Sequence, residues 1–179
     1  EAGQFFVFGK HDYSKLPKDR VGLLIEASMA FGTGHHGTTK GCLLALDKLI
    51  ARDKKIDEVI DIGCGTAVLA MAVAKVSSSR VIASDVDQVA VEVALANLKA
   101  NKLENRIACF QATGFEHTQI KSNAPFDLIF ANILKLPLID LAPSIRKYLK
   151  SNGHAIISGI LDAQAVEIIE VYLQHKLEV

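Results

Sequence analysis

The chain alternates short apolar runs with amphipathic segments, and this order limits the folds that it can adopt. The runs are rich in β-branched and aromatic residues, as expected of strands that are buried on both faces. Strands that alternate with helices pair in parallel, and the helices cover both faces of the sheet. We therefore predict an α/β fold, a Rossmann-like doubly wound, mostly parallel sheet in three α/β/α layers. The predicted strands are residues 4–9, 58–62, 80–85, 106–110, 126–132 and 154–159.

The segments between these runs have the apolar spacing of helices, and two of them begin with a capping residue. Thr38 is predicted to cap the first helix. Asp87 is predicted to cap a later helix in which Val91, Leu95 and Leu98 share one apolar face. The other predicted helices are residues 68–76, 136–149 and 163–173.

Composition excludes several classes of protein. The chain has 20 basic and 20 acidic residues and a formal net charge of +0, which leaves no electrostatic footprint for nucleic acid or an anionic membrane. The apolar run at residues 68–74 is too short to span a bilayer. Cys42, Cys64 and Cys109 do not form a C-x-x-C motif and are expected to be reduced core thiols. We therefore expect a cytoplasmic protein, a monomer without a membrane partner.

We divide the chain into an amino-terminal strand and lead-in segment, residues 1–28, and a ligand-binding domain, residues 29–179. Together they form a single domain, since 179 residues suit one hydrophobic core. The sequence opens without a methionine, and we expect it to be part of a longer protein.

Polar residues and glycines follow three of the predicted strands directly. Gly63 and Gly65 follow the strand at 58–62, and glycine lets the backbone turn tightly beside a ligand. Asp85 ends the next strand, 22 residues after Gly63, where a carboxylate can accept a ribose diol. Asn132 ends the strand at 126–132. Taken singly, the glycines suit a simple turn and Asp85 a helix cap, but their joint spacing favours a nucleoside-bearing ligand at this edge of the sheet.

The two common phosphate motifs do not fit this site. A dinucleotide fingerprint needs a third glycine where this chain has Val68, and no G-K-[ST] triplet is present. The Asp61 carboxylate, two residues before Gly63, would repel a pyrophosphate. It would instead favour a ligand with an ammonium group, such as the methionine end of S-adenosylmethionine.

The motifs "DIGCGTAVLA" and "ASDVD" resemble the cofactor signatures of class I S-adenosylmethionine-dependent methyltransferases. Three narrower motifs, "AFGTGHHGTT", "FANILKLPLIDLAP" and "SGILDAQ", resemble the bacterial methyltransferase family that modifies ribosomal large-subunit protein eleven. The resemblance covers nearly the whole chain. It implies the class I methyltransferase fold, S-adenosylmethionine as cofactor, and lysine side chains and the amino terminus of the ribosomal protein as methyl acceptors. It also implies an upstream substrate-recognition domain that this sequence does not include.

The resemblance also implies roles for individual residues. Positions matching Thr39, Gly63, Asp85 and Asn132 hold the cofactor, and Gly65 lies in the same turn. Asn132 is the candidate catalytic residue, orienting the donor and the amine, although it would also suit a simple strand-end cap. Ala67 replaces a third glycine that many class I enzymes have, and Lys135 places a cation beside the incoming lysine.

The glycine-rich stretch at residues 29–41 admits two interpretations. As a segment covering the cofactor, it would pack Phe31 against the ligand. As a metal site, it would depend on His35 and His36, but adjacent side chains diverge and zinc ligands must converge. We therefore expect no metal.

Three alternatives to a protein methyltransferase remain open. A nucleic-acid methyltransferase would carry two prolines and an aromatic ring after the strand-end asparagine, where this chain has Ile133 and Leu134. A small-molecule N-methyltransferase would use the same cofactor site. A non-catalytic binding module would keep the fold without turnover.

Overall fold

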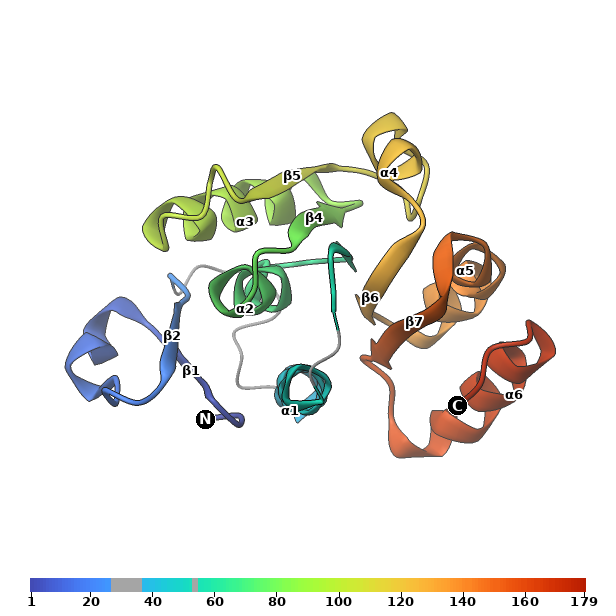
Figure 1. Cartoon of the computed structure of the whole chain (residues 1–179), viewed down its shortest axis with the longest axis horizontal. Coiled ribbons are helices and arrows are strands. Elements are labelled where there is room, and N and C mark those ends of the chain that lie inside the picture. The colour runs from blue at the N-terminus through green and yellow to red at the C-terminus, as the bar shows by residue number, and fades with distance from the viewer. Residues whose placement is uncertain (27–36, 53–54) are drawn as a thin grey trace.

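The computed structural model describes residues 1–26, 37–52 and 55–179 (Figure 1). Among these residues, no helix is both long enough and apolar enough to cross a membrane. The elements in chain order are β1 (Phe5–Phe8), η1 (Lys10–Lys15), β2 (Val21–Leu24), α1 (Gly37–Ala51), β3 (Glu58–Ile62), α2 (Val68–Val76), β4 (Arg80–Asp85), α3 (Gln88–Ala100), β5 (Ile107–Gln111), α4 (Thr118–Asn123), β6 (Phe126–Asn132), α5 (Lys135–Tyr148), β7 (Leu149–Ser158), η2 (Asp162–Gln164) and α6 (Ala165–Gln174).

The main sheet has five parallel strands in the order β5-β4-β3-β6-β7. The chain winds outward from β3 through β4 to β5, then returns to the other side of β3 with β6 and β7. This reversal confirms the doubly wound fold. It places the winding switch between β3 and β6, where ligands bind in such sheets.

Helices cover both faces of this sheet, because alternate strand residues point in opposite directions. Val59 of β3 belongs to a core formed with residues of α1, α2 and α3. The next residue, Ile60, belongs to a second core formed with residues of α4, α5 and α6. Both cores are apolar, which explains why the strands are continuously apolar in sequence.

The lead-in segment contains a second strand that the sequence analysis missed. β2 pairs in parallel with β1, and Phe5 and Leu23 are fully buried in the core of α1 and α2. The Lys75 side chain of α2 donates to the Gly22 carbonyl at 2.7 Å. This small sheet is therefore packed against the same helices as the main sheet.

Several predicted boundaries and faces need correction. Asp87 caps α3 as predicted, accepting from the Val89 N–H at 2.9 Å. Leu95, however, is 44% exposed, and the buried face of α3 carries Asn97 instead. α1 begins at Gly37, so Thr38 lies in its first turn and is not its cap. The short helix α4 was missed, and β7 begins five residues earlier than predicted.

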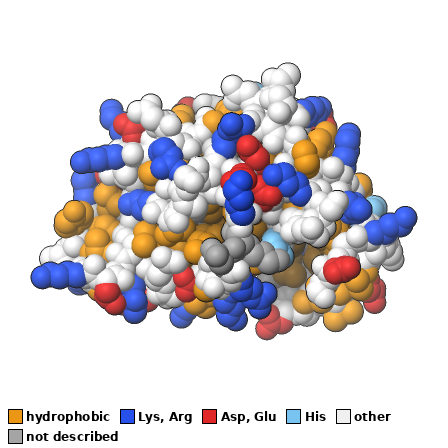
Figure 2. All heavy atoms as spheres, in the orientation of Figure 1, with side chains coloured by type: hydrophobic (Ala, Val, Ile, Leu, Met, Phe, Trp, Pro, Cys, Tyr) orange, Lys and Arg blue, Asp and Glu red, His pale blue; other side chains and the backbone are white. Residues whose placement is uncertain are grey.

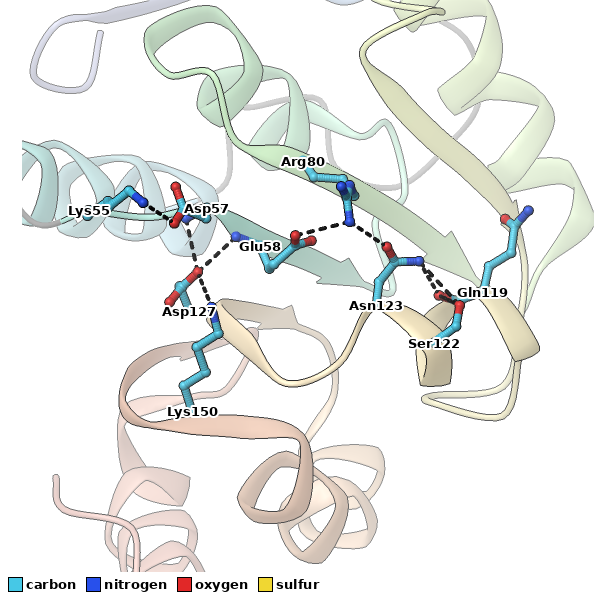
Figure 3. A network of polar contacts seen from close by, with 9 residues as sticks. All are labelled: Lys55, Asp57, Glu58, Arg80, Gln119, Ser122, Asn123, Asp127 and Lys150. Carbon is cyan, nitrogen blue, oxygen red and sulfur yellow. Dashed lines mark hydrogen bonds and ion pairs between the residues drawn. The ribbon is translucent and has the colours of Figure 1, made fainter.

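A polar network links the amino ends of the central strands (Figure 3). The Asp127 carboxylate accepts hydrogen bonds from the Asp57 and Glu58 N–H groups, at 3.0 and 2.9 Å, and from Lys150 Nζ at 2.8 Å. Burial alone would raise the pKa of Asp127, but the hydrogen bonds from Lys150, Glu58 and Asp57 outweigh it and hold the pKa below its ordinary value. We call this side of the sheet the amino edge and the opposite side the carboxyl edge.

Candidate functional site

Most of the predicted site residues meet at the carboxyl edge. Gly63 follows β3, and Asp85 and Asn132 are the last residues of β4 and β6, the two strands that flank β3. Thr39, in the first turn of α1, reaches the same edge through its contact with Asn132. Phe31 lies outside the described residues.

Residues 63–67, which we call the glycine turn, connect β3 to α2 through left-handed backbone conformations. Gly63 and Gly65 have φ values of +66° and +53°. A Cβ atom on Gly63 would lie only 2.3 Å from Ile133 Cγ2, so any larger residue collides with the loop after β6. Ala67 also has a positive φ, 61°, which costs an L-residue roughly 1–2 kcal/mol. Residue 67 therefore has a conformation that glycine would adopt without this cost.

Asp85 holds the glycine turn in place from the neighbouring strand. Its Oδ2 accepts from the Gly65 N–H at 2.9 Å, and its Oδ1 accepts from the Asp87 N–H at 3.1 Å. Each carboxylate oxygen has a further lone pair, and the residue is partly exposed. The side chain can therefore accept hydroxyl groups of a ligand while it anchors the turn.

Asp61 is buried between β3 and α2, with only 1% of its surface exposed. Its Oδ2 accepts from the Ala70 N–H at 3.1 Å and so satisfies a free amide in the first turn of α2. Burial raises the pKa of Asp61 to about 7, the Ala70 N–H opposes this rise, and the charge of Asp85 adds to it. The contact with an ammonium group remains a prediction, but this carboxyl is poised to change charge near neutral pH.

Asn132 has one side-chain atom without a partner. Its Nδ2 donates to Thr39 Oγ1 over 3.4 Å, a long contact. Its Oδ1 is buried and accepts no hydrogen bond from the residues that the structure describes. A buried acceptor in this state costs about 1–3 kcal/mol, which a ligand N–H would recover. The amide can therefore take an amine at the edge where the cofactor is expected.

Lys135, the first residue of α5, is paired with a residue that the sequence analysis missed. Its Nζ lies 3.0 Å from Glu167 Oε2 in the first turn of α6. The expected cation beside the acceptor therefore has a nearby carboxylate. The 32-residue separation gives no sequence signal for this pair.

Asn97 was also missed, although its position carried a signal. It follows Val91 and Ala94 at helical spacing, so it occupies the buried face of α3. Its Nδ2 donates to the Thr66 carbonyl in the glycine turn, and its Oδ1 accepts from the Glu26 N–H, both at 3.1 Å. One buried amide therefore connects the turn to the end of the lead-in segment.

The thiols and histidines in the described part of the chain do not indicate a metal site. Cys42 and Cys64 are buried, Cys109 is partly buried, and all three are free. Within the described residues, His, Cys, Asp and Glu do not gather in groups of three or more that could hold a metal. His35 and His36 lie outside these residues.

Comparisons with known proteins point to one family. A family model described as "Ribosomal protein L11 methyltransferase (PrmA)" matches residues 1–179. Ribosomal protein L11 methyltransferases from Caulobacter sp. (strain K31) and Brucella suis (strain ATCC 23445 / NCTC 10510) are each 44% identical to the chain, over 178 and 176 residues. These matches cover 99% and 98% of this chain, and 61% of each relative. The chain thus spans about three fifths of the length of these relatives.

Solved structures give the same result for the fold. The crystal structure of ribosomal protein L11 methylase from Lactobacillus delbrueckii subsp. bulgaricus superposes with a TM-score of 0.86 and 27% identity, covering 98% of this chain and 86% of that one. The precorrin-6y C5,15-methyltransferase from Geobacter metallireducens GS-15, at 18% identity, shares the fold with a TM-score of 0.61, over 74% of this chain and 70% of its own.

Proposed function

This chain belongs to the ribosomal protein L11 methyltransferase family, and we propose that it transfers methyl groups from S-adenosylmethionine to amino groups of ribosomal protein L11. The acceptors would be lysine side chains and the amino terminus, and the reaction would take place in the cytoplasm, where ribosomes are assembled. The observation that carries the proposal is the buried Asn132 Oδ1 at the carboxyl edge, which accepts no hydrogen bond from the described residues.

The residues of the carboxyl edge fit S-adenosylmethionine by their chemistry. Asp85 offers free lone pairs for ribose hydroxyls, and the glycine turn brings main-chain atoms close to the ligand. Asp61 lies behind this turn, and its carboxylate would stabilise the ammonium of the methionine end. When bound, the cofactor supplies an electrophilic methyl group on a sulfonium sulfur.

The remaining task of the protein is to prepare and orient the acceptor amine. A lysine ammonium has an ordinary pKa of about 10.4, and only the neutral amine has a lone pair for the methyl carbon. The loop after Asn132 continues with Ile133 and Leu134, whose apolar surface would lower the acceptor pKa by desolvation. Asn132 Oδ1 would accept an amine N–H and point the lone pair at the methyl group. Alignment of this kind contributes up to roughly 7–11 kcal/mol to catalysis.

Surface charge is consistent with a protein substrate. On the face in view in Figure 2, basic side chains are spread out and interspersed with acidic and apolar ones. The net charge of +0 agrees with this mixture. Neither feature resembles the basic stripe that is typical of nucleic-acid enzymes.

Two measurements test the proposal. Isothermal titration should give binding of S-adenosylmethionine and no binding of NAD. Transfer of a radiolabelled methyl group should reach purified ribosomal protein L11 and not ribosomal RNA. Binding of NAD, or label on RNA alone, would contradict the proposal. Cofactor binding without transfer to any acceptor would favour a non-catalytic module.

A further inference from the structure

The loop after Asn132 is held by the end of the neighbouring strand, β7. Asn132 pairs with Ser158 in the parallel register, and the Ile133 N–H donates to the Ser158 carbonyl at 3.1 Å. The Ser158 side chain also lies close to Cys42 of α1. Ser158 therefore lies between the loop after β6 and the helix that carries Thr39.

Gly159 follows Ser158 and lies directly against the Ile133 peptide. Its φ is +88°, a conformation that L side chains rarely adopt. A Cβ atom here would lie 2.3 Å from the Ile133 carbonyl oxygen and 2.6 Å from its nitrogen. These are main-chain atoms, which cannot rotate away as a side-chain terminus can. Only glycine fits without displacement of the loop.

Ile133 is thus enclosed by two glycines from different strand ends. Its side chain lies against Gly63 of the glycine turn, and its main chain lies against Gly159. The preceding residue is Asn132, whose amide faces Thr39. A shift of the Ile133 peptide therefore moves Asn132 relative to the glycine turn.

We propose that Gly159 is a positioning residue for methyl transfer. Because Gly159 has no side chain, the Ile133 peptide can pack directly against it, and this contact fixes the position of the Asn132 amide. The inference rests on the proposed function and adds the "SGILDAQ" motif to the site. Gly159 acts through Ile133 and does not itself contact the cofactor or the acceptor.

The test is Gly159→Ala in the intact protein, with S-adenosylmethionine and ribosomal protein L11 as substrates. The substitution should lower kcat roughly 10- to 100-fold, because a displacement of about 1 Å has effects of this size. The Kd for the cofactor and the KM for the acceptor should change less than about threefold, since the glycine turn stays in place. Gly3→Ala is the matched control, because Gly3 also has a positive φ, +57°, and the three atoms nearest to an added Cβ belong to the Asp47 side chain and not to the loop after β6.

A double substitution separates the two contacts of Ile133. Ile133→Ala removes Cγ2, the atom that a side chain at Gly63 would meet. The double variant Gly63→Ala/Ile133→Ala should therefore bind the cofactor more tightly than Gly63→Ala alone. It leaves the main chain unchanged, so it should not restore the kcat of Gly159→Ala. If Gly159→Ala does not fold, Gly159→Asn decides, because asparagine tolerates a positive φ better than alanine while its Cβ still meets the Ile133 peptide: it should reduce kcat and keep the cofactor Kd.

Three outcomes would contradict the positioning role of Gly159. A folded Gly159→Ala protein with the kcat of the unsubstituted protein would overturn the positioning role. Equal losses of cofactor binding and kcat would also overturn it, since Gly159 would then support the cofactor site as a whole. No methyl transfer by the unsubstituted protein would refute the proposed function itself, and the role of Gly159 with it.

Discussion

Asp85 Oδ2 lies 2.9 Å from the Gly65 nitrogen, so the last residue of β4 fixes the turn that follows β3. The same carboxylate is the predicted partner of the cofactor ribose. Anchoring and recognition thus depend on one side chain, and substitutions must be chosen to separate them.

Asp85→Ala should weaken S-adenosylmethionine binding roughly 10- to 100-fold, because charge-assisted hydrogen bonds contribute about 1.5–3 kcal/mol. Asp85→Asn should have a smaller effect, since its amide oxygen can still accept from Gly65. Titration calorimetry measures both. Asp19→Ala is the control, because this exposed carboxylate lies in the lead-in segment and its removal should leave the Kd unchanged. An unchanged Kd in folded Asp85→Ala would remove this residue from the site.

Asn132→Ala should lower the turnover number at least about tenfold and weaken cofactor binding by a smaller factor, if the amide orients the reacting groups. Steady-state transfer of labelled methyl groups at saturating substrate gives the turnover number. Asn123→Ala, at a partly exposed asparagine that bonds to Arg80 at the amino edge, is the control. Wild-type turnover by Asn132→Ala would contradict the orienting role.

Asp61 should make stability depend on pH near neutrality. Burial raises its pKa from 3.8 to about 7, so between these values the folded chain binds a proton that the unfolded chain has lost. The free energy of unfolding should therefore decrease as pH rises through this range. Asp61→Asn should remove that part of the decrease, whereas Asp19→Asn, at an exposed carboxylate, should not. Urea denaturation at about pH 5 and about pH 8 compares the three proteins, and identical pH dependence in all of them would refute the burial argument.

Asp127 should show the opposite dependence. Its pKa is held below 3.8, so its contribution to stability is present above the unfolded-state pKa and is lost as pH falls through the lower folded-state pKa. Asp127→Asn should cost about 2 kcal/mol at neutral pH, and the difference from wild type should diminish in acid. Cofactor affinity should be unchanged, because the substitution lies at the amino edge. A changed Kd with unaltered stability would contradict this division between the two edges.

The sequence predicted the main sheet because each of its strands contains a short apolar run, and most of these runs lie between segments with helical spacing. The bounds of β3, β4 and β6 agree with the predicted strands at 58–62, 80–85 and 126–132. The same pattern predicted that Gly63, Asp85 and Asn132 would share one edge, since parallel strands end on the same side.

What the sequence did not reveal depends on contacts between distant segments. β2 is a four-residue strand whose pairing with β1 has no local signal. Glu167 reaches Lys135 from another helix, and Gly159 was part of a motif without an assigned role. Leu95 was placed on the wrong face because the apolar pattern was followed past Asn97, a polar residue whose bonds are satisfied inside the protein.

Ala67 shows where the shape of the glycine turn originates. A free peptide with alanine at this position would rarely adopt the left-handed conformation, so this end of the turn is not encoded by its own residue. The conformation is imposed by the packing of α2, whose Met71 is fully buried and donates its N–H to the Ala67 carbonyl at 2.9 Å. Mutations deep in the core beneath α2 would therefore change the ligand-free ensemble of the turn, without touching any residue that meets the cofactor.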